Sequence, residues 1–171
     1  MGMFDTVYVS SDVAAAWKLL CRTCGRPPEA QYQWQTKSLD PGLQSYLLRY
    51  DQSGVIRLYL LDHPSDRRFW RPWTEREIEE SRRMWAEGSG IFTPKKADEG
   101  CFLPDAYLPQ NRRQRFMGEL PHQWVEIHGG CGCGEFAEYW IKFSDGIAVE
   151  CRTKQPALGL DFFDDASEFD I

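Results

Sequence analysis

The 171-residue sequence lacks the features that would place it in a membrane or in the secretory pathway. No apolar run approaches the ~20 residues that a transmembrane helix needs. The opening residues, MGMFDTVYVSSD, have no basic segment followed by an apolar one, so we expect no secretory signal. We therefore expect a reducing, cytoplasmic location, where paired cysteines bind metals more often than they form disulfides.

Familiar catalytic motifs are also missing. The sequence has no phosphate-binding glycine loop, no HExxH helix and no GxSxG elbow, and it has only three histidines. A small enzyme would have to use a cluster near residues 126–133, in which Glu126 and His128 share a predicted strand face near Cys133. The polar face of an ordinary strand explains the same spacing, so the sequence leans toward a non-enzymatic protein.

A general excess of positive charge is absent as well. The net charge is −6, and the last eleven residues, DFFDDASEFDI, hold five acids and no base. The preceding 160 residues therefore come close to neutrality, and they cannot attract a phosphate backbone through bulk charge. Nucleic-acid binding would need a local basic patch.

What the sequence does have is the composition of a folded domain, with 42% hydrophobic and 14% aromatic residues. We predict a single α+β domain over residues 1–160, followed by an acidic-aromatic tail over 161–171. The expected architecture is a mainly antiparallel β-sheet with two helices and a ribbon-like cysteine knuckle site.

Alternating apolar residues predict most of the strands. They cover residues 4–9 and 31–37, a hairpin over 46–61 that turns at DQSG, a strand beginning at QWVEIH, and a hairpin over 137–152. In the last strand, the alternation places Ile147, Val149 and Cys151 on the buried face.

Two segments carry helical signals. Residues 12–20, DVAAAWKLL, form a short amphipathic pattern that ends near Cys21. The segment that follows Thr74 is the clearer helix, because Thr74 and Glu77 have the spacing of a capping box and Gly88 provides a stop. Residues 88–121 show little periodicity and are predicted as a long loop.

Four cysteines form the most specific motif. Cys21 and Cys24 occur as CRTCG, and Cys131 and Cys133 occur as CGCG, each beside predicted strands. Four thiolates around one ion are the usual ligands of structural zinc. In the second pair the two cysteines are separated by one residue instead of the usual two. His128 is an alternative metal ligand to either Cys131 or Cys133.

Other interpretations of the cysteines stay open. They could be free thiols whose glycines serve only turns, a redox pair, or a catalytic zinc site. A redox pair normally opens a helix whose dipole lowers the thiol pKa, whereas Cys21 is expected to close one. A catalytic zinc needs an open position, which four cysteines would fill. We interpret Cys151 as a buried apolar cysteine, and Cys101 has no assigned role.

Two clusters of arginine are candidates for nucleic-acid contact. Arg68, Trp70 and Arg71 lie in the segment RRFWRPW, where guanidinium and indole groups suit base stacking. Arg112 and Arg113 belong to the basic run over 112–115. The simpler interpretation has the tryptophans packing and the arginines pairing with the glutamates at positions 75, 79 and 80 of the following helix.

The tail is the candidate partner-binding segment. Its candidate contact residues are Phe162, Phe163, Asp164, Asp165 and Phe169. Alternating acids and aromatics suit a basic groove with an apolar pocket, and the composition resembles the acidic tips of bacterial single-strand-binding proteins. Phenylalanines that fold back onto the body are the alternative.

The segments MFDTVYV, CRTCG and QTKSLDPGLQSY resemble a group of small uncharacterised proteins from phages and bacteria. Those proteins pair an MFDT-type first strand with a CxxCG knuckle, a QTK segment and a later CxxCG knuckle. The likeness covers about the first fifty residues and the CGCG near 131; this sequence departs from it through VAAAWKLL and the CxC spacing. The resemblance implies a zinc-ribbon-like β protein of phage origin and no activity.

The sequence therefore predicts a zinc-stabilised accessory protein of a phage or mobile element, which binds and inhibits a host protein that handles nucleic acid. A nucleic-acid-binding module that uses residues 67–73 and 112–115 is the first alternative. A small enzyme with a site near residues 126–133 is the second.

Overall fold

The computed structural model describes residues 4–21, 23–26, 33–39, 43–89, 93–131 and 133–153. These residues divide into two compact units. One unit contains residues 1–61 and 114–171, and the other contains residues 62–113. The division lies inside the range 1–160 that the sequence analysis treats as one domain.

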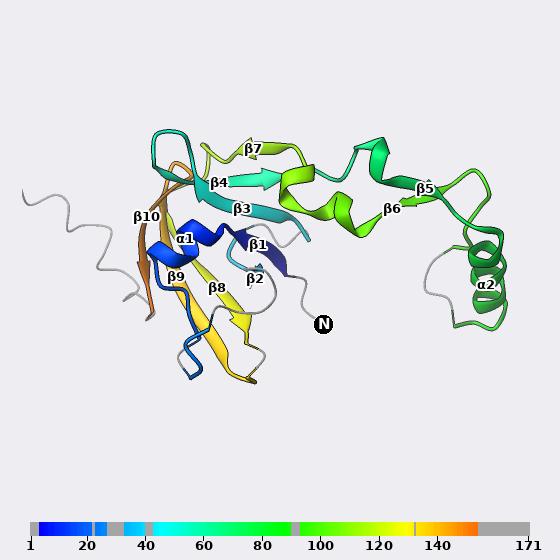
Figure 1. The fold of residues 1–171 in the computed structure, drawn as a ribbon, viewed down its shortest axis with the longest axis horizontal. Helices are drawn as coiled ribbons and strands as arrows, with labels where there is room; N and C mark the ends of the chain where they lie inside the picture. The colour runs from blue at the N-terminus through cyan, green and yellow to red at the C-terminus, as the bar shows by residue number, and fades with distance from the viewer. Residues whose placement is uncertain are drawn as a thin grey trace, which may run out of the picture. The chain divides into compact units, whose positions relative to one another are not determined.

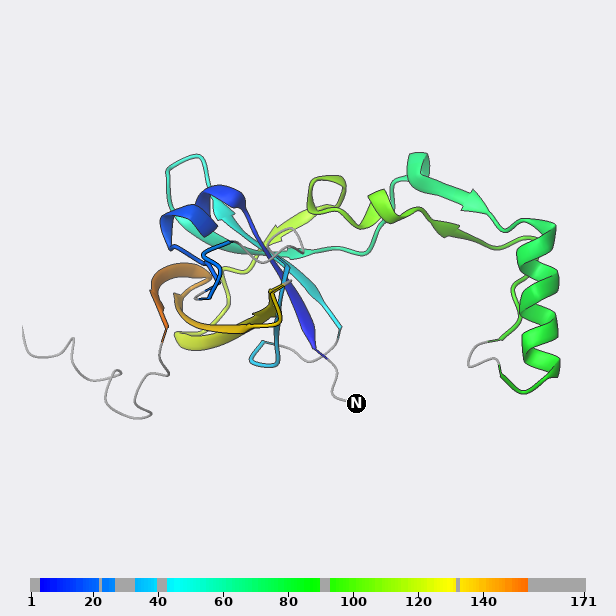
Figure 2. The same cartoon turned by 60° about the horizontal axis from the view of Figure 1, so that its bottom comes forward.

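The first unit is built around a curved sheet (Figures 1 and 2). Its strands are β1 (Asp5–Val9), β2 (Gln33–Thr36), β3 (Ser45–Tyr50), β4 (Ile56–Leu61), β7 (Gln114–Phe116), β8 (Gln123–Gly130), β9 (Phe136–Ser144) and β10 (Ile147–Arg152). Their order is β10-β9-β8-β2-β1-β3-β4-β7, and β10 also pairs with β4. Seven strands therefore close into a barrel, and β7 extends β4 outside the ring.

The closed ring corrects one part of the predicted fold. The α+β class with two helices and a mainly antiparallel sheet is confirmed, but the sheet closes into a barrel, which the sequence did not predict. In a closed ring the number of antiparallel pairings must be even, so seven strands require at least one parallel pairing. That pairing joins β1 to β3, with Val7 opposite Tyr46. A parallel pair needs a long crossover, and residues 10–44 provide it.

The core fills the inside of the barrel with alternate residues from each strand. Val7 and Val9 of β1 and Trp34 of β2 are almost completely buried. Trp34 fits because Gly129 of β8 faces it, and a Cβ atom on Gly129 would lie 3.0 Å from the indole ring. The large indole thus occupies space that a side chain on β8 would otherwise fill.

The hairpin of β3 and β4 is confirmed where the sequence predicts it. The Asp51 carboxylate accepts hydrogen bonds from the backbone N–H of Ser53 at 2.8 Å and of Val55 at 3.0 Å. Hydrogen bonding from the Ser53 hydroxyl is the main cause that lowers the pKa of Asp51 to about 2. A charged aspartate therefore holds this turn.

The second predicted hairpin, β9–β10, contains a β-bulge. Ala148 lies opposite Phe143, but the next pair is Glu150 with Lys142, so the register shifts at Val149. Ala148 is buried, whereas Val149 is 55% exposed. The prediction that Val149 faces the core is therefore wrong, because an extra residue in one strand reverses the alternation.

The helix that precedes the first cysteines, α1 (Ser11–Ala16), is shorter than predicted. Lys18 has a positive φ of 52°, a conformation that a continuing helix does not allow. The chain turns there, and Leu19 is completely buried in the core. Neither of the α-helices that the structure describes is long and apolar enough to cross a membrane.

The second unit combines a helix with a two-stranded sheet. Helix α2 (Glu75–Ala86) begins with the predicted capping box, in which Thr74 and Glu77 each bond to the other's backbone N–H. Strand β5 (Trp70–Pro72) pairs with β6 (Gly100–Phe102). Short 3₁₀ helices η1 (Arg67–Phe69), η2 (Pro104–Tyr107) and η3 (Pro109–Asn111) complete it. The predicted loop over 88–121 thus contains strands β6 and β7 as well as η2 and η3.

We predict that Gly146→Ala destabilises the barrel much more than Gly54→Ala. Both glycines have a positive φ, 73° and 82°. A Cβ atom on Gly146 would lie 2.2 Å from the carbonyl oxygen of Met117, whereas Gly54 has open space. We expect a loss of about 3 kcal/mol or more for Gly146→Ala and about 1 kcal/mol for Gly54→Ala. Chemical denaturation measures both, and equal losses would contradict the packing argument.

Candidate metal centre

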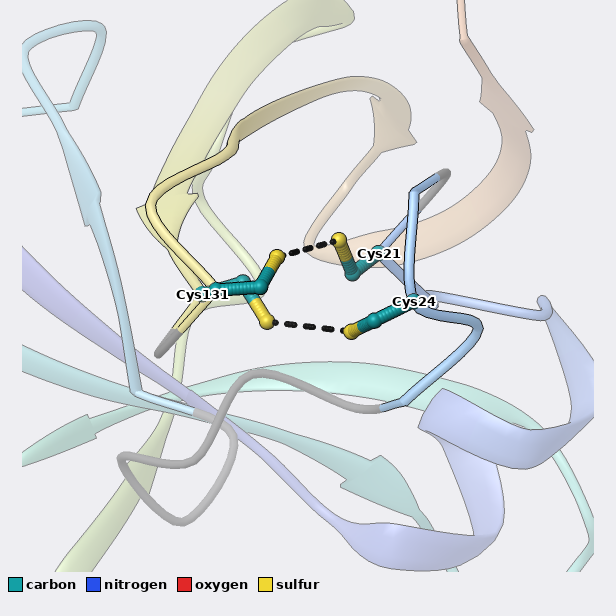
Figure 3. A group of neighbouring side chains, drawn as sticks. Cys21, Cys24 and Cys131 are labelled. Atoms are coloured by element: carbon teal, nitrogen blue, oxygen red, sulfur yellow. Dashed lines mark hydrogen bonds between the residues drawn. The ribbon is translucent and has the colours of Figure 1, made fainter.

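The first cysteine pair lies in a tight knuckle between α1 and β2. The backbone N–H of Cys21 donates to the carbonyl of Arg26 at 2.8 Å, and the N–H of Gly25 donates to the carbonyl of Cys21 at 2.8 Å. Gly25 has a φ of 66°, a conformation that glycine adopts without steric cost. The chain thereby reverses and directs the side chains of Cys21 and Cys24 to the same side (Figure 3).

The second pair lies in the turn between β8 and β9, and its bonding follows the same plan. The N–H of Cys131 donates to the carbonyl of Glu135 at 2.8 Å, and the N–H of Gly134 donates to the carbonyl of Cys131 at 2.9 Å. Gly134 also has a positive φ, 90°. The turn is one residue shorter than the first knuckle, so the CxC spacing suits it and does not prevent the two pairs from meeting.

The four sulfur atoms converge on one space, as Figure 3 shows. Cys21 Sγ lies 3.4 Å from Cys133 Sγ, and Cys24 Sγ lies 3.4 Å from Cys131 Sγ. All four lie within 4.8 Å of one another. Four thiolates at ~2.3 Å from a central ion would be about 3.8 Å apart. The set could therefore hold a metal ion, and all six cysteines of the protein are free of disulfides.

The electrostatics of the cluster favour a cation. A hydrogen bond from the backbone N–H of Cys24 is the main cause that lowers the pKa of Cys21 to about 7. For Cys133, the N–H of Glu135 lowers the pKa, but the neighbouring thiols of Cys21 and Cys131 raise it, to about 12 overall. One thiolate therefore makes it harder for its neighbours to ionise. A bound cation would remove this repulsion and allow all four thiols to ionise.

Tyr139 positions the first knuckle, and the sequence analysis did not identify it. Its hydroxyl accepts a hydrogen bond from the Leu20 N–H at 3.2 Å and donates to the Leu20 carbonyl at 2.9 Å. The ring is buried and packs edge-on against Trp34. A barrel residue thus fixes the backbone next to Cys21. Strand alternation predicts a buried tyrosine at this position, but nothing local indicates where its hydroxyl bonds.

His128 does not join the cysteine cluster. Its ring packs against Phe136 and Phe4, with centroid distances of 5.3 Å and 5.4 Å. Its Nδ1 lies 3.9 Å from a carboxylate oxygen of Glu126. Among the described residues, the four cysteines are the only group with the geometry to hold a metal ion. The alternative in which His128 takes the place of Cys131 or Cys133 as a metal ligand is therefore wrong.

The remaining cysteines lie elsewhere. Cys151 packs against the barrel core, and burial is the main cause that raises its pKa to about 12. The side chain is half-buried, so its interpretation as a buried apolar cysteine holds in part, and the raised pKa disfavours the reactive thiolate at neutral pH. Cys101 lies in β6 of the second unit, opposite Arg71.

Two of the three arginines of residues 67–71, Arg68 and Arg71, pair with carboxylates within the second unit. Arg71 makes two hydrogen bonds to Glu77, at 2.7 Å and 2.8 Å. The same pairing is the main cause that lowers the pKa of Glu77. Arg68 pairs with Asp66 at 2.6 Å. The partners differ from the helix glutamates expected at positions 75, 79 and 80, but the charges are neutralised as the simpler interpretation requires.

The tryptophan of this segment has a packing role. The Trp70 ring lies over Gly100 of the neighbouring strand, where a Cβ atom would be 2.4 Å from the ring. Arg67 covers the same ring at 5.0 Å from its centroid. Arg112 donates from Nε to the carbonyl of Asp62 at 2.7 Å. Arg113 lies 4.0 Å from the Asp62 carboxylate.

The structure therefore does not bring all the predicted site residues together. It unites the four cysteines, whereas Arg68, Trp70 and Arg71 contact residues of their own unit. The tail candidates Phe162, Phe163, Asp164, Asp165 and Phe169 lie outside the described residues. Models of known protein families, curated proteins and solved structures were each compared with the chain, and none matches it.

We predict that Tyr139→Phe weakens metal binding without removing a ligand. The change keeps the ring but removes the hydroxyl that donates to the Leu20 carbonyl, whereas the Leu20 N–H keeps its bond to the Lys18 carbonyl at 2.8 Å. The lost hydrogen bond costs about 1 kcal/mol. We expect about a tenfold loss of metal affinity, as for other groups that orient ligands. Competition with a chromogenic chelator measures it. Tyr59→Phe, on a ring that contacts Phe116, is the control, and an equal loss there would refute the positioning role.

Proposed function

We propose that the protein is a non-enzymatic binding protein whose barrel is stabilised by one structural zinc ion. The observation that carries this proposal is the convergence of four cysteine sulfurs from the two knuckles. Four soft thiolates in a tetrahedral arrangement suit zinc or an iron–sulfur cluster. Sulfur–sulfur separations of 3.4–4.8 Å fit a single ion, so zinc is the simpler occupant.

The ligand set supports a structural role for the metal. A catalytic zinc ion keeps one coordination position for water or substrate, and four cysteines leave none. Glu126 and His128 lie beside each other on β8, but Cys133 belongs to the metal cluster. The small enzyme with a Cys/His/Glu site would therefore have to use a cysteine that the proposed zinc ion also needs.

Nucleic-acid binding through residues 67–73 and 112–115 has less support than protein binding. Residues 62–113 contain ten acidic and ten basic side chains, so this unit has no net charge. Arg68 and Arg71, the candidate nucleic-acid contacts of this unit, are already paired with carboxylates. A phosphate backbone would have to displace these ion pairs to bind.

The proposed partner is a host protein that handles nucleic acid. The acidic-aromatic tail over 161–171 carries five of the acids and three phenylalanines of the chain. Such a segment has the charge and the apolar groups to compete for a groove that normally binds nucleic acid. Together with the resemblance to phage proteins, this supports an inhibitory accessory role.

The zinc ion is tested by metal analysis of the purified protein. We expect about one zinc per chain, protection of the thiols of Cys21, Cys24, Cys131 and Cys133 from a thiol reagent, and their exposure after chelation. Cys24→Ser should lose the metal. The control Cys151→Ser should keep it, because Cys151 packs in the core. Absence of zinc, or an equal loss of zinc from both variants, would refute the proposal. If the metal analysis found iron and sulfide instead, the site would hold an iron–sulfur cluster.

The binding role of the tail is tested by truncation after Leu160. We expect the full chain, used as bait with chemical cross-linking, to recover a host protein that the truncated chain does not. Replacing Phe162, Phe163 and Phe169 by alanine tests the aromatic contribution at unchanged charge. Zinc content and thermal unfolding serve as the control for folding. If the truncated chain recovered every partner of the full chain, the tail would be excluded as the contact.

A further inference from the structure

Two arginines lie directly opposite each other on the barrel. Strands β3 and β4 pair in antiparallel register, with Arg49 opposite Arg57 (strands in Figure 1). Like charges in directly opposed positions repel, and antiparallel sheets usually avoid them. Neighbouring Leu48 and Leu58 point into the core, so both arginines lie on the outer face. The arrangement needs a compensating negative charge.

Arg49 has neutral hydrogen-bond partners. Its Nε donates to the side-chain oxygen of Gln114 at 2.8 Å, and its NH1 donates to the carbonyl of Tyr50 at 2.9 Å. The guanidinium lies over the Tyr59 ring, 4.3 Å from its centroid. These contacts fix the orientation of the guanidinium group. An arginine has five N–H donors, so some of them remain for a ligand.

Arg57 has one carboxylate partner, Asp51, at 2.6 Å, and it lies over the Phe116 ring at 4.8 Å from the centroid. Asp51 is also held by the backbone of the hairpin turn. Its pKa is lowered to about 2, chiefly by the Ser53 hydroxyl, so it stays charged at neutral pH. Among the described residues that line this site there are two guanidinium groups and one carboxylate, so these residues together carry one excess positive charge.

The two arginines line a cavity of about 560 Å³. Its other lining residues are Asp51, Gln52, Ser53, Tyr59 and Phe116. The volume lies in the range of small-molecule sites. Aromatic rings form part of the wall, and the fixed guanidinium groups provide convergent N–H donors.

We propose that this cavity binds a phosphate group, with Arg49 and Arg57 donating to different oxygen atoms of the same anion. Planar guanidinium forks match the oxygen geometry of phosphate and bind it through more than one hydrogen bond. Asp51 compensates one of the two arginines, and a phosphate group supplies the negative charge for the other. The binding site lies on β3, β4 and β7, and it does not use the cysteines or the tail.

The phosphate could belong to a free small molecule or to a nucleic-acid strand, because both present phosphate oxygens that accept hydrogen bonds from guanidinium groups. Inorganic diphosphate is the probe for the free group, and a short single-stranded oligonucleotide is the probe for the strand. A guanidinium group lies over one face of each of the Tyr59 and Phe116 rings, so base stacking on those faces is not part of the proposal. We therefore expect diphosphate to bind without help from a base.

The test is isothermal titration of the zinc-loaded full chain with inorganic diphosphate at low ionic strength. We expect saturable binding that Arg49→Gln weakens about tenfold or more, because charge-assisted hydrogen bonds are lost. Arg49→Lys keeps the charge but not the fork and should bind with intermediate affinity. Arg115→Gln is the matched control. It removes the same charge from β7, and Arg115 does not line the cavity.

The outcomes separate the site from general electrostatics. No binding of diphosphate by the unchanged protein would overturn the proposal, as would equal weakening in Arg49→Gln and Arg115→Gln. Thermal unfolding of each variant shows whether a loss reflects misfolding, and in that case the Arg49→Lys result decides. An oligonucleotide that binds more tightly than diphosphate and depends on Arg49 would assign the phosphate to a nucleic-acid strand.

Discussion

The fold depends on closing a ring of seven strands. Such a ring cannot be antiparallel throughout, and its one parallel pairing joins β1 to β3, so the chain must cross between these two strands. That crossover carries α1, the first cysteine knuckle and β2. The knuckle is therefore part of the connection that the closed ring requires. Its position brings it to the turn between β8 and β9, because β2 leaves the crossover to pair with β8.

A metal ion held by the four cysteines would strengthen the barrel where its strand pairing is sparse. Strands β2 and β8 share a single registered pair, Gln35 with His128, whereas β8 and β9 pair along eight positions. The knuckles precede β2 and follow β8, so a bound ion would join the two sides of this seam. Cys24 and Cys131 are 107 residues apart, and a link across so long a segment removes much freedom from the unfolded chain. A metal ion in this position would therefore act on the stability of the fold.

Local signals in the sequence predicted the features of the fold that depend on residues close in sequence. The features that depend on partners far along the chain were not predicted. The capping box at Thr74, the turn after Asp51 and the cysteine knuckles rely on residues close in sequence, and all three occur in the structure. The register shift at Val149 and the hydroxyl bonds of Tyr139 depend on partners far along the chain. The ring closure between β4 and β10 is of the same kind. Periodicity describes one strand at a time, so it contains no information on these pairings.

The distribution of arginines shows why composition misjudges binding sites. Residues 67–73 contain the densest run of arginine and tryptophan in the chain. The nearby carboxylates of Asp66 and Glu77, however, neutralise Arg68 and Arg71. Arg49 and Arg57 are unremarkable in sequence, since each alternates with core residues of a strand. They acquire significance only when the antiparallel register places them opposite each other. A concentration of charge in space, set by strand pairing, therefore decides where an anion finds donors that are still available to it.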